Sequence, residues 1–172
     1  MTTHHIAEKA GVGVGTVYDY FDNKDDIIYM MSERLFDELV QLVERVTPQM
    51  IEYKLEAALL LLLEEFEAFL MKNNGRYLKF AKELSIHDSL QVHTRQIRQT
   101  LLNSSVKLIL RHPEYVQIPN LYVMASIIID AGIYLVLDNL SSTKPDVSFE
   151  QLKAGLSDLI HVYVNHYVSG VG

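Results

Sequence analysis

Cysteine is absent from this sequence of 172 residues. Without cysteine the chain can form neither disulfide bonds nor cysteine-ligated metal sites, and it suits a reducing compartment. The residues that follow Met1 are polar, with threonine at positions 2 and 3 and histidine at positions 4 and 5, so no secretory signal peptide is recognisable. We therefore expect a cytoplasmic protein.

Long uncharged apolar runs are also missing. The most hydrophobic run, from Leu121 to Leu137, contains Asp130 and is shorter than a transmembrane helix requires. We interpret it as a buried interface helix, and we expect no membrane partner.

The chain lacks internal repeats, low-complexity segments and the alternating pattern of β-strands. Apolar residues make up 49% of it, which is enough for a substantial core, and they recur at helical spacing. The pattern predicts an all-α protein. The expected helices are Thr3–Ala10, Val14–Tyr20, Lys24–Val46, Gln49–Asn73, Arg76–Ser85, Leu90–Leu110, Asn120–Leu140 and Ser148–Val168, with breaks at Thr47-Pro48 and at Asn73-Asn74-Gly75.

The most informative segment is Ile6 to Ile28, with the sequence IAEKAGVGVGTVYDYFDNKDDII. Gly11 follows the apolar residues of a first short helix, where a left-handed residue commonly ends a helix. Asn23 can cap a later helix, and Asp26 three residues on completes a capping pair. Two short helices joined by a glycine turn predict a helix-turn-helix, whose second helix enters the major groove of DNA.

The identities within this segment resemble the DNA-binding signature of the TetR family of repressors. The matching residues are Ala10-Gly11-Val12, Gly15-Thr16, Tyr18, Tyr20-Phe21 and Lys24. The resemblance implies a DNA-binding region at residues 1–46 and a helical ligand-binding and dimerisation domain at residues 47–172. The helix from Lys24 would be shared by the two domains, so that movement at one end is felt at the other.

The resemblance also implies which residues contact DNA. Backbone amides at the start of the second helix attract phosphate, and the side chains around it would contact phosphates or the groove. The expected DNA-binding residues are Thr2, Thr3, Gly13, Val14, Gly15, Thr16, Tyr18, Asp19, Tyr20 and Lys24. Asp19 would either accept a hydrogen bond from a cytosine amine or point aside. Packing within the small domain is the alternative for the aromatic residues, and it is the role we assign to Phe21.

Positive charge is scarce where a DNA-binding protein usually has it. The net charge is −7. The first 45 residues have a net charge of −5, because four basic residues (Lys9, Lys24, Arg34, Arg45) face nine acidic ones (Glu8, Asp19, Asp22, Asp25, Asp26, Glu33, Asp37, Glu38, Glu44). Family members normally carry a basic arm and a further helix ahead of this point. Either those parts lie upstream of Met1, or the chain is a truncated relative.

Aromatic and polar residues in the remainder predict a ligand cavity. The expected ligand-binding residues are Phe66, Phe69, Tyr77, Phe80, His93, Asp130 and Tyr134. Core packing is the alternative for the aromatic residues. Asp130 stands among isoleucines, so it must find a partner, be partly protonated or border solvent, as a ligand anchor or as an interface hydrogen-bonding group.

The last two expected helices are too apolar for one small subunit to bury, which predicts a homodimer. The interface residues would include Leu121, Ile128, Leu135, Leu152, Leu156, Leu159, Ile160 and Tyr163. By resemblance the four helices of two subunits form a bundle that places the recognition helices roughly 34 Å apart, one turn of DNA.

The sequence thus predicts a regulator, most simply a repressor released from a palindromic operator by a small apolar or amphipathic effector. One alternative is a ligand-binding dimer that has lost DNA affinity. The other is a small helical enzyme, which would need a convergent titratable site such as one around His93 or Asp130. No catalytic motif is present, and a metal held by His4, His5 and Glu8 would have too few ligands, so we expect no cofactor and no enzyme activity.

Overall fold

The computed structural model describes residues 2–84, 90–142 and 144–168, without the side chains of 73, 74, 81–84, 90–94, 137, 140 and 141. The described residues form helices and no strand, so the all-α prediction is confirmed. The helices are α1 (Thr3–Ala10), α2 (Val14–Tyr18), α3 (Lys24–Met50), α4 (Leu55–Leu84), α5 (Leu90–Arg111), α6 (Pro113–Val116), α7 (Leu121–Ser141) and α8 (Phe149–Val168).

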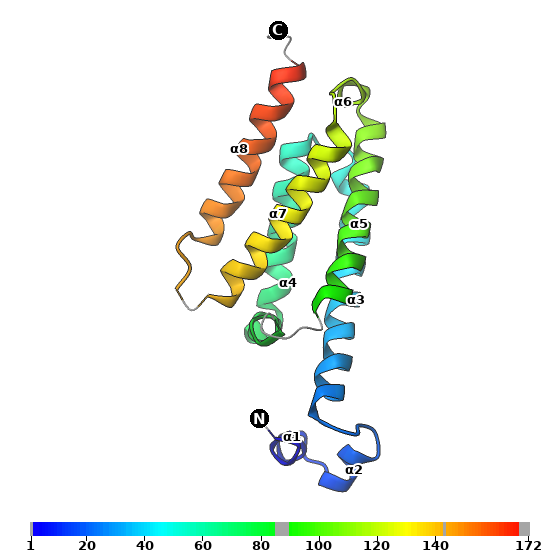
Figure 1. Ribbon diagram of the computed structural model, residues 1–172, viewed down its shortest axis with the longest axis vertical. Helices are drawn as coiled ribbons and strands as arrows, with labels where there is room; N and C mark the ends of the chain where they lie inside the picture. The colour runs from blue at the N-terminus through cyan, green and yellow to red at the C-terminus, as the bar shows by residue number, and fades with distance from the viewer. Residues whose placement is uncertain (1, 85–89, 143, 169–172) are drawn as a thin grey trace.

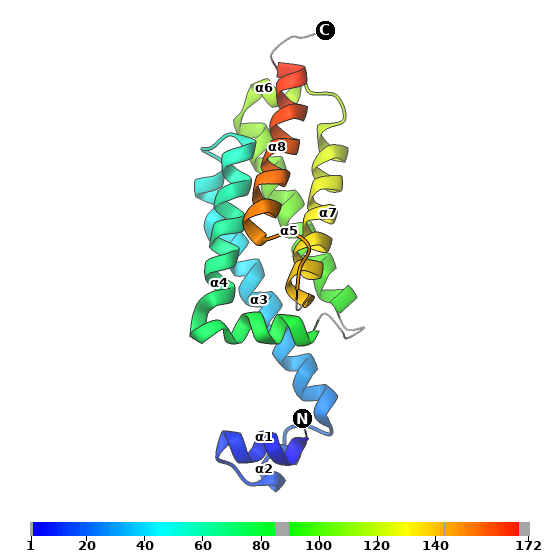
Figure 2. The same ribbon diagram turned by 90° about the vertical axis from the view of Figure 1, so that its left-hand side faces the viewer.

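The molecule is elongated, and α3 joins its two parts (Figures 1 and 2). Helices α1 and α2 lie at one end of α3, beyond the other helices. We call residues 2–28 the N-terminal unit. The rest of α3 packs with α4 and α5, which in turn contact α7 and α8, and we call this part the bundle.

Each part has its own core. Ala7, Val17 and Ile27 are buried in the N-terminal unit, where Ile6, Val14 and Phe21 pack against them. The buried residues of the bundle core begin further along α3 at Leu35, and the half-buried Ile28 already packs against that core. The division into domains at residue 46 stays a prediction, whereas the packing changes from one core to the other within α3, between Ile27 and Leu35.

The end of α3 differs from its prediction. The break expected at Thr47-Pro48 does not occur, because the helix continues through Pro48 to Met50. Proline removes one helical hydrogen bond, a small loss so near the end of a helix. Thr47 and Met50 are buried, and the Thr47 hydroxyl lies 2.7 Å from both the Val43 carbonyl oxygen and the Ser104 hydroxyl of α5. Tertiary packing therefore holds this turn.

Two further boundaries also differ. The expected helices Gln49–Asn73 and Arg76–Ser85 form one helix, α4, that starts only at Leu55. The chain nevertheless turns at Gly75, whose φ is +70°, and the segment after it runs crosswise to the rest of α4 (Figure 2). The loop expected between Pro113 and Pro119 contains the short helix α6, which buries Tyr115.

Candidate DNA-binding and ligand-binding sites

The first two helices form a compact pair. The Thr2 side chain caps α1 by accepting a hydrogen bond from the His5 amide at 3.4 Å. Gly11 has a φ of +70°, a conformation that glycine adopts without strain, and it ends α1. Gly13 then caps α2 with extended backbone and no side-chain hydrogen bond. The predicted glycine turn between two helices is therefore present.

Helix α2 has an inner and an outer face. Val17 is buried and Val14 is half-buried, because both pack in the small core. The outer face, continued by the two residues after the helix, consists of exposed residues, namely Gly15, Thr16, Tyr18, Asp19 and Tyr20. Tyr18 and Tyr20 are 50% and 78% exposed, so neither ring is part of the core. The Tyr18 hydroxyl lies 3.4 Å from the Thr3 hydroxyl, which places α1 hydroxyls beside this face.

Some of the acidic residues of the N-terminal unit lie at the start of α3, where they stabilise the helix end. The Asn23 side chain accepts from the amides of Asp25 and Asp26 at 2.8 and 3.0 Å. The Asp26 carboxylate accepts from the amides of Asn23 and Asp22 at 3.2 and 3.0 Å. The predicted capping pair is confirmed, and its carboxylates complement the positive end of the helix dipole. Lys24, the first residue of α3, makes no ion pair with any described residue.

A comparison with known protein families agrees with the helix-turn-helix arrangement of this segment. The family model "Bacterial regulatory proteins, tetR family" matches residues 1–29, which are α1, α2 and the first residues of α3. Residues 1–29 thus resemble the N-terminal DNA-binding region of TetR-family regulators. This match supports a DNA-binding regulator of the TetR type. Searches among curated proteins and among solved structures gave no significant match.

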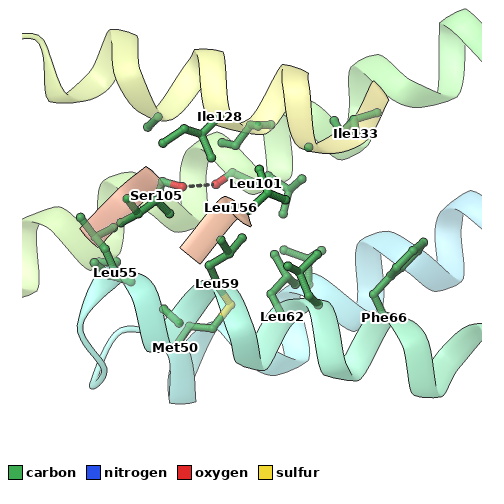
Figure 3. A pocket seen from close by; sticks show the side chains of 18 of the residues that line it. Met50, Leu55, Leu59, Leu62, Phe66, Leu101, Ser105, Ile128, Ile133 and Leu156 are labelled. Atoms are coloured by element: carbon green, nitrogen blue, oxygen red, sulfur yellow. Dashed lines mark hydrogen bonds between the residues drawn. The ribbon is translucent and has the colours of Figure 1, made fainter. Parts of the chain in front are cut away.

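The bundle contains a cavity of about 210 Å³ that is partly open to the surface. Five helices contribute to its wall, with Leu59, Leu62 and Phe66 of α4 facing Ile128 and Ile133 of α7 across it (Figure 3). Among the described residues of the wall, only Ser105 and Tyr163 carry a hydroxyl, and none carries a charge. From α3, the wall contains Phe36, Leu39, Leu42, Val43 and Met50.

Among the predicted ligand-binding residues whose side chains are described, only Phe66 belongs to this wall. Phe69 is buried in the core and stacks on Tyr77, with ring centroids 4.8 Å apart. Phe80 packs against the same core, and Tyr134 is 68% exposed on α7. His93 belongs to α5, but its side chain lies outside the described part of the chain.

Asp130 has its partner on the surface. It pairs with Arg98 of α5, whose guanidinium donates through Nη2 to Oδ2 at 3.1 Å and through Nε to Oδ1. The carboxylate is 51% exposed, so the neighbouring isoleucines do not bury it. Asp130 thus ties α7 to α5 and is not part of the cavity wall.

A second polar contact joins α3 to the bent end of α4. The Tyr77 hydroxyl donates to the Glu38 carboxylate at 2.7 Å. This hydrogen bond is the main cause that lowers the pKa of Glu38, and the Arg34 guanidinium also lowers it. The same bond raises the pKa of Tyr77. Tyr77, predicted to bind ligand, therefore fixes the bend of α4 against the middle of α3.

The predicted dimer surface needs a correction. Leu121, Leu152, Leu156 and Ile160 are buried in the core of their own subunit and cannot face a partner. The outer faces of α7 and α8 carry other exposed apolar residues, among them Val123, Ile127, Tyr134, Leu159 and Val162. No helix within the described ranges has the length and hydropathy that crossing a membrane would require.

Proposed function

We propose that this protein is a repressor that binds a palindromic operator as a homodimer and is released by a small ligand in the bundle cavity. The observation that carries the proposal is the double role of α3. Its Ile27 belongs to the small core that holds α2, and its Phe36 to Met50 segment supplies part of the cavity wall. A ligand in the cavity therefore contacts the helix that positions α2.

On DNA, the outer face of α2 enters the major groove. Thr16, Tyr18 and Tyr20 present hydroxyls there, and the backbone of Gly13, Val14 and Gly15 presents the amides of the helix start to phosphate. Lys24, free of ion pairs among the described residues, would bind a phosphate, with the hydroxyls of Thr2 and Thr3 beside it. Asp19 lies at the end of α2 and is exposed, so it can accept from a cytosine amine or turn aside.

The dimer would form through α7 and α8. Val123, Ile127 and Tyr134 recur at helical spacing on the exposed face of α7, and Gly155, Leu159 and Val162 do so on α8. Exposed apolar stripes on neighbouring helices are typical of subunit interfaces. Packing them around a twofold axis gives a four-helix bundle and sets the distance between the two copies of α2.

The DNA contact can be tested with a matched pair of tyrosine variants. Tyr18→Phe removes one hydroxyl from the outer face of α2 and should weaken duplex binding about tenfold, since a hydrogen bond to a charged group is lost. Tyr53→Phe removes the hydroxyl of an exposed tyrosine between α3 and α4, far from α2, and should bind like the wild type. Fluorescence anisotropy with a labelled duplex measures both.

The same titration at increasing salt concentration tests the electrostatic contribution to DNA binding. Affinity must fall as salt rises, because phosphate contacts release counterions. Equal binding by both variants and the wild type would reject the assignment of α2 as the DNA-contacting helix.

The second candidate function is a ligand-binding dimer without effective DNA binding. The net charge of −5 over residues 1–45 favours it, since acidic residues repel the phosphates of DNA and only some of them are engaged in capping α3. Salt-independent anisotropy, or no binding at low salt, would support this candidate against the repressor.

A further inference from the structure

Both hydroxyls in the cavity wall are already engaged within the protein. Ser105 donates to the Leu101 carbonyl oxygen of its own helix at 2.9 Å (Figure 3). Tyr163 donates to the Pro119 carbonyl oxygen at 2.8 Å. The other described wall residues are aliphatic, Phe, Met, Ala or Gly. A charged ligand placed here would lose its hydration without gaining a partner, which is unfavourable.

Charged side chains of the helices around the cavity form ion pairs with one another outside it. Asp130 pairs with Arg98 on the surface, and Lys153 is held by Glu67 at 3.2 Å and Glu150 at 2.6 Å. None of these side chains belongs to the described wall. The cavity is therefore suited to a neutral guest.

The volume of this partly open cavity favours a small molecule. An engineered apolar cavity of about 150 Å³ in another protein stays dry and binds benzene, whereas drug-sized ligands occupy about 300–1,000 Å³. The cavity of about 210 Å³ lies between these values and nearer to the first. It matches one six-membered ring with a short substituent, or an aliphatic chain of similar size.

Gly132 contributes to this space. It lies in α7 and belongs to the wall, and a Cβ built on it would meet no atom within 4 Å beyond its own neighbourhood. A Cβ atom at position 132 therefore meets no collision, and we expect a larger side chain there to take up space that a ligand would use. Because glycine is unfavourable inside a helix, its replacement should also strengthen α7.

We propose that the cavity binds a neutral hydrocarbon-like molecule of about one ring, and that Gly132 sets the size it accepts. The inference builds on the proposed function, in which the ligand of this cavity is the effector. It narrows that effector to an uncharged compound without a carboxylate, phosphate or ammonium group.

Toluene and benzoate are suitable probes, since they share a ring and differ in charge. In thermal unfolding of the full-length protein in sealed cells, toluene should raise Tm saturably. Benzoate should bind at least 100-fold more weakly. Absence of saturable toluene binding, or binding of benzoate as tight as that of toluene, would overturn the proposal.

Two substitutions locate the binding. Gly132→Leu should weaken toluene binding at least tenfold, while the helical circular dichroism is kept and the Tm of the unliganded protein is not lowered, and Gly132→Ala should give a smaller loss. Ala57→Leu, at an exposed position of α4 outside the wall, should bind toluene like the wild type. Equal toluene affinity in Gly132→Leu and Ala57→Leu would overturn the role of Gly132.

Anisotropy with duplex DNA separates this inference from the proposed function. If toluene binds in the Gly132-dependent way and leaves DNA affinity unchanged, the ligand class is supported and the release mechanism fails. If a charged compound releases the DNA at concentrations where toluene does not bind, the release mechanism is supported and the ligand class is overturned.

Discussion

The N-terminal unit and the bundle share α3 but differ in the size of their cores. The described part of the N-terminal unit buries only Ala7, Val17 and Ile27, whereas the core of the bundle draws on α3, α4, α5, α6, α7 and α8. Apolar burial is the main favourable contribution to folding, so the bundle carries most of the stability. The N-terminal unit depends on caps, a glycine turn and its attachment to α3.

This difference suits a switch, because a marginally stable part responds to small displacements of the part that supports it. Helix α3 is the physical connection, since it supplies Ile27 to one core and Leu35, Leu39 and Leu42 to the other. The variants below test whether the two cores behave independently.

The largest effect is expected in the bundle. Leu70 of α4 is 3% exposed and lies outside the cavity wall. Leu70→Ala should lower the free energy of unfolding by about 3 kcal/mol, through lost apolar burial and the void that remains. Urea unfolding followed by circular dichroism measures the change. A loss well below 1 kcal/mol would contradict the assignment of this helix to the main core.

A smaller and local effect is expected in the N-terminal unit. Ile27→Ala should destabilise this unit by about 2 kcal/mol, which makes amide exchange in residues 3–18 about thirtyfold faster. The urea midpoint of the bundle should stay at the wild-type value, and DNA affinity should fall. If amides of α4 and α8 lose protection to the same extent, the two parts form one cooperative unit and the comparison fails.

The smallest effect concerns the polar contact between α3 and α4. Tyr77→Phe removes the hydrogen bond to Glu38 and should cost about 1 kcal/mol at pH 7. That bond lowers the pKa of Glu38 in the folded protein, so its contribution is present at neutral pH and is lost as the pH falls through this lowered value. The difference in unfolding free energy between variant and wild type should therefore shrink from pH 6 towards pH 3.

Tyr53→Phe is the control for that titration, and it should match the wild type at every pH. A difference between Tyr77→Phe and wild type that is constant over the whole range would show that the hydrogen bond does not act through the ionised Glu38.

Local signals in the sequence were sufficient to predict most helix ends of the N-terminal unit. Gly11, Asn23 and Asp26 act on neighbouring backbone, so their roles at helix ends could be predicted, and α1 has its expected bounds. Gly75 likewise marks a change of direction, although the helix assignment continues through it. Pro48 misled the prediction because the packing of Thr47 and Met50 in the core outweighs one missing hydrogen bond.

The cavity could not be predicted in this way. Its wall combines residues from five helices, and a void exists only once their side chains have been placed. Helix α7 is apolar on most sides, so periodicity does not tell which side faces inward, and the role of Asp130 as ligand anchor or interface group stayed open. Ser105 and Gly132 gave no signal, because a serine and a glycine in a helix have many ordinary explanations.

Selection of bound duplexes from a random DNA pool by the full-length protein tests the central claim, that two copies of α2 act together on one face of DNA. The enriched sequences should be palindromic, with half-site centres about 10 bp or a multiple of one helical turn apart. Enrichment of single, unpaired sites, or no enrichment over the starting pool, would contradict the account.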